Sequence, residues 1–103
     1  MSFTVHCGDF AVDEDDEDDG CWEVEGFASA AVATEYARRF IRAQIEDLRR
    51  DADNAVVLKE MYLMWGEYAT TEGFDSAAWV DHCIANPASR KAETDYDALD
   101  PNP

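Results

Sequence analysis

The chain has 103 residues, which fits one small domain with a single hydrophobic core. Apolar residues make up 47% of it, and the formal net charge is −16. So large a negative charge repels nucleic acid and anionic membranes, which argues against direct binding to either. Basic protein surfaces and cations are the partners that this charge favours.

The cysteines and the N-terminus predict a cytoplasmic protein. Three cysteines, an odd number at unrelated spacings, argue against a disulfide framework and for a reducing compartment. The first ten residues, MSFTVHCGDF, lack the basic start and apolar run of a signal peptide. No apolar stretch approaches the roughly 20 residues that span a bilayer.

Two alternating segments near the N-terminus predict an antiparallel β-hairpin over residues 2–27. Residues 2–12 form the first expected strand, with a slip in the apolar phase at 8–9 that indicates a β-bulge. Residues 21–27 form the second, with one apolar and one acidic face. Packed on the helices that follow, the hairpin would place Phe3, Val5, Trp22 and Val24 in the core.

Seven consecutive acidic residues, 13–19, connect the two expected strands at the tip of the hairpin. Like charges this close repel one another, so the run costs stability and contributes nothing to a core. It is either a tolerated solvated loop or a surface that meets a basic partner. The candidate acidic face consists of Asp13, Glu14, Asp15, Asp16, Glu17, Asp18, Asp19, Glu23 and Glu25.

Three amphipathic helices are expected after the hairpin, over about 30–50, 54–69 and 76–85. Apolar residues recur there at spacings of three and four, and capping residues precede each stretch: Ser29, the stretch Asp51 to Asn54, and either Asp75 or Ser76. The result is an α+β domain over residues 1–87, with element order ββααα.

Residues 88–103 are expected to form an acidic, flexible C-terminal tail outside the domain. The exposed hairpin edge could pair with that of a second copy, so a homodimer stays open.

The acidic run matches a calcium-binding loop only in part. Counted from Asp15, Gly20 falls at the sixth position, but the twelfth is Gly26, which offers no ligand. The two His-Cys pairs, 6–7 and 82–83, are adjacent residues whose side chains diverge on a strand or a helix. We therefore expect no metal site and no cofactor.

Catalytic motifs are also missing from the sequence. A cysteine nucleophile with a histidine base stays open, but no local motif supports it, and there is no phosphate-binding loop. We therefore expect a protein that is not an enzyme.

Five of the eight basic residues lie in the first expected helix. A basic patch is one interpretation; the stronger one is local balance, because the pairs Glu35–Arg39, Arg42–Glu46 and Glu46–Arg50 are spaced i,i+4. The excess negative charge then belongs to the hairpin and the tail.

Most aromatic side chains after the hairpin are expected in the core, namely Trp65, Tyr68, Phe74 and Trp79. Trp22 and Tyr62 are the candidates for exposed aromatic anchors, since such residues are enriched at protein interfaces.

The small size, the acidic face and the lack of catalytic motifs resemble, in kind, the small acidic phage-encoded inhibitors, including anti-CRISPR proteins and DNA mimics. Those inhibitors share no common motif, so the resemblance assigns a role to no residue. It implies an inhibitor that blocks a basic, nucleic-acid-binding surface of a defence complex in the bacterial cytoplasm, by mimicry or steric block.

Three other functions stay open from the sequence. One is a non-mimic interaction or accessory module, such as an antitoxin-like partner. Another is a cation-binding or halophile-type protein, although clustered acids fit this less well than spread ones. The last is a small enzyme, which would need a pocket with perturbed ionisable groups.

Overall fold

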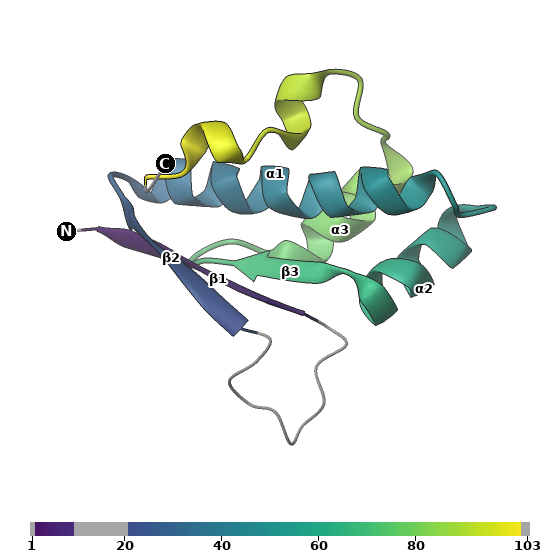
Figure 1. The fold of residues 1–103 in the computed structure, drawn as a ribbon, viewed down its shortest axis with the longest axis horizontal. Coiled ribbons are helices and arrows are strands. Elements are labelled where there is room, and N and C mark those ends of the chain that lie inside the picture. Colours follow the sequence, from purple (N-terminus) through teal and green to yellow (C-terminus); the bar gives the residue numbers. More distant parts are fainter. Residues whose placement is uncertain (1, 10–20, 102–103) are drawn as a thin grey trace.

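The computed structural model describes residues 2–9 and 21–101. A three-stranded antiparallel sheet, in the order β2-β1-β3, packs against three helices in a mixed α+β arrangement (Figure 1). The elements are β1 (Phe3–Asp9), β2 (Cys21–Phe27), α1 (Ala30–Arg49), α2 (Ala55–Trp65), β3 (Glu67–Thr70), α3 (Ser76–Ala85) and the short 3-10 helices η1 (Lys91–Thr94) and η2 (Asp97–Leu99).

The strand register sorts the sheet residues onto two faces. Val5 lies opposite Val24, and Cys7 lies opposite both Trp22 and Ala69. Because side chains alternate along a strand, these residues share the face that packs on α1. That face and α1 enclose the core, whose largest fully buried side chains are Tyr62, Phe27, Ile41, Ile45, Leu58, Val5, Cys7 and Cys83.

The helix starts follow the predicted capping residues. The Ser29 hydroxyl accepts a hydrogen bond from the Val32 amide at 3.2 Å. Asn54 caps α2 in the same way, with its side-chain oxygen 3.0 Å from the amide nitrogen of Val57. Asp75, rather than Ser76, caps α3. Each cap satisfies one of the amide groups that a helix N-terminus leaves without a partner.

The helix expected over 54–69 is shorter than predicted. It ends at Trp65, because the backbone of Gly66 is extended. A side chain at Gly66 would come within 2.6 Å of the Tyr62 carbonyl oxygen, so this turn requires glycine. Residues 67–70 then form β3, which pairs antiparallel with β1. The element order is therefore ββααβα, and the predicted two-stranded hairpin is part of a three-stranded sheet.

Two details of the hairpin also differ. The register shift lies between Phe3 and Thr4, not at 8–9, so the predicted bulge is misplaced. The first strand ends at Asp9 within the described residues. The remainder of the strand predicted over 2–12 lies outside them.

The C-terminal segment runs back along the side of α1 that faces away from the sheet (Figure 1). The ring centroid of Tyr96 lies 5.6 Å from that of Tyr36 and 5.1 Å from that of Phe40, both in α1. Leu99 packs against the same core. The sequence places residues 88–103 outside the domain; in the structure, the packed part of the domain extends to about residue 101.

Candidate protein interaction surface

The acidic run 13–19 lies outside the described residues. Its covalent attachment is fixed, however, because the chain leaves β1 at Asp9 and enters β2 at Cys21. Glu67, the first residue of β3, pairs with Asp9 at this end of the sheet. Two described residues at this end of the sheet, Asp9 and Glu67, are therefore acidic.

Glu23 and Glu25 lie on the face of the sheet that points away from α1. Their cross-strand partners are His6 and Thr4, on the same face of β1. Glu23 Oε1 lies 3.2 Å from His6 Nδ1, and both side chains are about half exposed. None of the three strands contains a lysine or an arginine. This open face therefore carries carboxylates and a single histidine as its ionisable charges.

Positive and negative charges are segregated along the chain. Residues 1–37 contain eleven acidic residues and no lysine or arginine. All basic residues come later, in α1, in α2 and around η1: Arg38, Arg39, Arg42, Arg49, Arg50, Lys59, Arg90 and Lys91. The first third of the chain, which includes β1 and β2, thus has no cationic side chain except histidine.

Two arginines of α1 hold the C-terminal end of α3. Arg49 donates hydrogen bonds to the carbonyl oxygens of Cys83 at 2.7 Å and Ile84 at 3.3 Å. Arg42, only 4% exposed, donates to the carbonyl oxygen of Asn86 at 2.8 Å. These carbonyls lack partners within their own helix, and a cation suits the negative end of its dipole. Arg42 and Arg49 therefore have a structural role.

The predicted ion pairs of α1 are confirmed in two of three cases. Arg39 and Glu35 are 3.0 Å apart, and Arg42 and Glu46 are 3.9 Å apart. The third prediction is wrong in its partner, because Glu46 pairs with Arg49 at 2.9 Å instead of Arg50. Arg49 thus contacts both Glu46 and the carbonyl oxygen of Cys83 at the end of α3.

The structure separates the two candidate aromatic anchors. Trp22 is 40% exposed, with its ring 6.2 Å from that of Phe40, so one side packs on α1 while the other faces solvent. Tyr62 is 1% exposed, and its hydroxyl donates to the carbonyl oxygen of Glu67 at 3.0 Å. Tyr62 is a core residue, which corrects the expectation of an exposed anchor there.

An exposed apolar surface on α2 has no counterpart in the predictions. Four of its side chains are between 49% and 70% exposed: Val56, Leu63, Met64 and Trp65. Trp65 is predicted in the core, but it is the last residue of α2 and is 61% exposed. The signal was in the sequence AVVLKEMYLMW, because a helix that is apolar nearly all round must either be fully buried or expose apolar side chains.

A mostly apolar pocket of about 340 Å³ opens between α2, β3 and α3. Tyr62, Leu63 and Val80 contribute apolar lining. Lys59 and Asp81 join α2 to α3 at this pocket, with Nζ and Oδ1 2.8 Å apart. Leu63 belongs both to this lining and to the exposed surface of α2, so the pocket and that surface are continuous.

The ring of Tyr68 covers Gly8 on the open face of the sheet. Any side chain at Gly8 would overlap with this ring. The Tyr68 hydroxyl lies 3.5 Å from Cys21 Sγ, across Gly8 of the intervening strand β1. The sequence predicts Tyr68 in the core, whereas its ring lies on the open face, where it covers Gly8 of the central strand.

The cysteines and histidines do not come together as a site. Cys7 and Cys83 are buried, whereas His6 and His82 are exposed. Desolvation, aided by the charge of Glu67, raises the pKa of Cys7 to about 12, and desolvation raises that of Cys83 to about 11. Both are therefore protonated and weakly nucleophilic near neutral pH. Within residues 2–9 and 21–101, no three His, Cys, Asp or Glu side chains are grouped to hold a metal ion.

The fold and the surface define a small α+β protein with an open acidic sheet face beside an exposed apolar helix. Comparisons of the chain with protein-family models, with curated proteins and with solved structures find no significant match. Among the helices that the structure describes, none has the length and apolarity to cross a membrane.

Proposed function

We propose that this protein is an inhibitor that binds a basic, nucleic-acid-binding surface on an effector of a bacterial defence complex. The segregation of charge carries the proposal. The first 37 residues have no lysine or arginine, while Arg42 and Arg49 are engaged in packing α1 against α3. The negative charge of the sheet face and of run 13–19 therefore has no cationic residue among the strands to balance it.

A surface of this kind suits a basic nucleic-acid-binding track. Duplex DNA carries about one negative charge per 1.7 Å of its axis, and its binders expose matching lysines and arginines. Carboxylates that project from a folded sheet occupy such a track at a small entropic cost, because the sheet already orders them. Opposite charges also accelerate association, in a manner that added salt weakens.

Competition with DNA tests the proposal. The tagged protein is used to capture partners from bacterial lysate at low salt, and the captured proteins are challenged with excess duplex DNA. We expect DNA to displace the specific partner. A variant with residues 13–19 changed to Asn and Gln should retain less than about a tenth of the partner at the same salt. A partner that neither DNA nor the neutralised run affects would refute the proposal.

The exposed apolar surface of α2 favours a second candidate, a non-mimic interaction or accessory module. Val56 and Leu63, seven positions apart, lie on one face of α2 and are 70% and 49% exposed, and exposed apolar side chains that share a face are typical of protein-binding surfaces. In that case, changing Val56 and Leu63 together to Ser should abolish capture of the partner, and the neutralised run should leave capture intact. The same two variants therefore separate the two candidates.

A further inference from the structure

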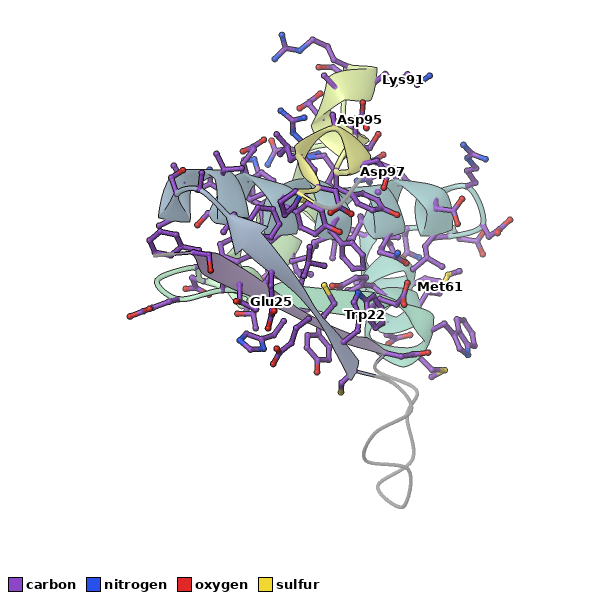
Figure 2. The ribbon with its side chains drawn as sticks, turned by 60° about the vertical axis from the view of Figure 1, so that its left-hand side comes forward. Trp22, Glu25, Met61, Lys91, Asp95 and Asp97 are labelled. Atoms are coloured by element: carbon purple, nitrogen blue, oxygen red, sulfur yellow. The ribbon has the colours of Figure 1, made fainter. Side chains whose placement is uncertain are left out.

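β2 is an edge strand over most of its length. The sheet order is β2-β1-β3, and within the described residues no strand pairs with the outer side of β2. Figure 2 shows β2 in front of the other strands, with Trp22 and Glu25 projecting from it. An edge strand presents the amide and carbonyl groups of every second residue outward, and natural proteins usually protect such edges with lysine or proline. The sequence of β2, CWEVEGF, contains neither, and its charged residues, Glu23 and Glu25, protect the edge only against acidic strands.

We propose that an extended segment of the partner, with alternating basic and apolar residues, pairs with the outer edge of β2 as a fourth strand. This inference rests on the proposed function, since it states how a basic partner is bound. The segment covers Cys21 to Glu25, because the C-terminal segment reaches the far end of β2 at Gly26. There, a side chain at Gly26 would come within 3.6 Å of Pro101 Cβ.

The acidic face of β2 selects basic residues in the added strand. Glu23 and Glu25 lie two positions apart on the open face, so their side chains are separated by roughly 7 Å along the strand. Basic residues two positions apart in the added strand have the same spacing and lie beside these carboxylates. Opposite charges on neighbouring strands stabilise pairing.

The opposite face of β2 selects apolar residues in between. Trp22 and Val24 lie on the side of α1, where Trp22 packs one edge of its ring on Phe40 and remains 40% exposed. An apolar residue in the added strand would cover the exposed side of this ring. Burial of that apolar surface gives the pairing a contribution that charge alone cannot provide.

A second copy of this chain is a poorer occupant of the same edge. Antiparallel pairing of two β2 strands about Val24 would place Glu23 of one copy opposite Glu25 of the other. Like charges directly opposite each other destabilise a strand pair, and each chain carries a net charge of −16. The two glutamates thus disfavour self-association and favour a basic strand.

Two synthetic nine-residue peptides test strand pairing. One alternates Lys and Val, and the other has the same composition with all lysines at one end. At about 20 mM NaCl, where charges are weakly screened, we expect the alternating peptide to bind at least about ten times more tightly by fluorescence anisotropy. It should also protect the backbone amides of β2 from hydrogen exchange, which the block peptide should not do.

Charge-reversal variants locate the binding site. The double variant Glu23→Lys with Glu25→Lys should weaken binding of the alternating peptide at least about tenfold. Its control, Asp51→Lys with Asp53→Lys, makes the same change in net charge in the α1–α2 connection, at the other end of the molecule (Figure 1), and should weaken binding less than about threefold. Far-UV circular dichroism checks that both variants fold.

The outcomes distinguish this inference from the proposed function. Equal binding of the two peptides, or equal effects of the two double variants, would overturn strand pairing while leaving an acidic protein that binds basic surfaces. If the DNA-competed partner is captured but neither peptide binds, strand pairing is again wrong. If no captured partner responds to DNA or to the neutralised run, the proposed function fails, whatever the peptides do.

Discussion

At the scale of single residues, the three thiols differ in ways that their sequence neighbours do not reveal. Cys7 points into the core from β1, Cys83 does so from α3, and Cys21 is exposed at the start of β2. Each of the two buried thiols follows an exposed histidine, which the sequence alone presents as a metal or nucleophile motif. Alternation along the strand and rotation along the helix separate them.

We expect only Cys21 to react rapidly with a thiol reagent at pH 8. Burial keeps Cys7 and Cys83 protonated and out of contact with the reagent, since their pKa values are raised to about 12 and about 11. A DTNB assay should therefore count one fast thiol in the native protein and three in denaturant. Three fast thiols under native conditions would contradict the burial of Cys7 and Cys83.

The same burial makes stability fall at alkaline pH. An unfolded cysteine ionises near 9.0, and the raised folded pKa of Cys7 means that the unfolded state loses its proton first. The stability that burial of the protonated Cys7 thiol contributes is therefore fully present below about pH 9, and it is lost as the pH rises toward the folded pKa. The free energy of unfolding in urea should be lower at pH 10.5 than at pH 8. The difference should be smaller in the variant Cys7→Ala, which lacks this thiol.

At the scale of elements, the link between α1 and α3 depends on arginine side chains of α1 that donate hydrogen bonds to carbonyl oxygens at the end of α3. We expect Arg49→Ala to lower the free energy of unfolding by about 1–2 kcal/mol, because it removes charge-assisted hydrogen bonds to Cys83 and Ile84. Arg50→Ala is the matched control. It removes an exposed arginine one position away and should cost less than about 0.5 kcal/mol. Equal losses in urea unfolding would show that α3 does not depend on Arg49.

The sequence predicts the parts of the fold that local chemistry decides. The hairpin strands, the caps at Ser29 and Asn54, and the third helix follow from alternation, capping and apolar spacing. The strand β3 does not, because it has four residues and its partner β1 lies about sixty positions earlier in the chain. Residues 67–69 fit the end of the preceding helix equally well. Only the pairing with β1 favours a strand over a longer helix.

Exposure is harder to predict than structure for the same reason. The composition of α2 shows that it is apolar nearly all round, but the side that is covered depends on how α1, β3 and α3 pack around it. Trp65 and Tyr62 therefore exchanged roles: the expected core tryptophan is 61% exposed, and the candidate anchor is buried. The acidic residues of the candidate face that the structure describes, Glu23 and Glu25, are exposed as alternation predicts.

At the scale of the whole molecule, the net charge of −16 makes the folded state repel itself. Salt screens this repulsion, since the Debye length falls to about 10 Å at 0.1 M and about 3 Å at 1 M. We therefore expect the midpoint of thermal unfolding to rise by about 4–8 °C between 20 mM and 500 mM NaCl, which corresponds to about 1 kcal/mol for a domain of this size.

The same salt that stabilises the fold should weaken partner binding, because one set of carboxylates is responsible for both effects. Changing residues 13–19 to Asn and Gln removes seven of the acids, so the variant should unfold at a higher temperature at low salt and respond less to added salt. MgCl₂ and NaCl at equal ionic strength separate screening from ion binding, since screening depends on ionic strength and a bound ion stabilises by its own affinity. Scanning calorimetry with each salt measures the difference. A midpoint several degrees higher in MgCl₂ would identify the acids as a cation site, and an equal midpoint would leave them available to a basic partner.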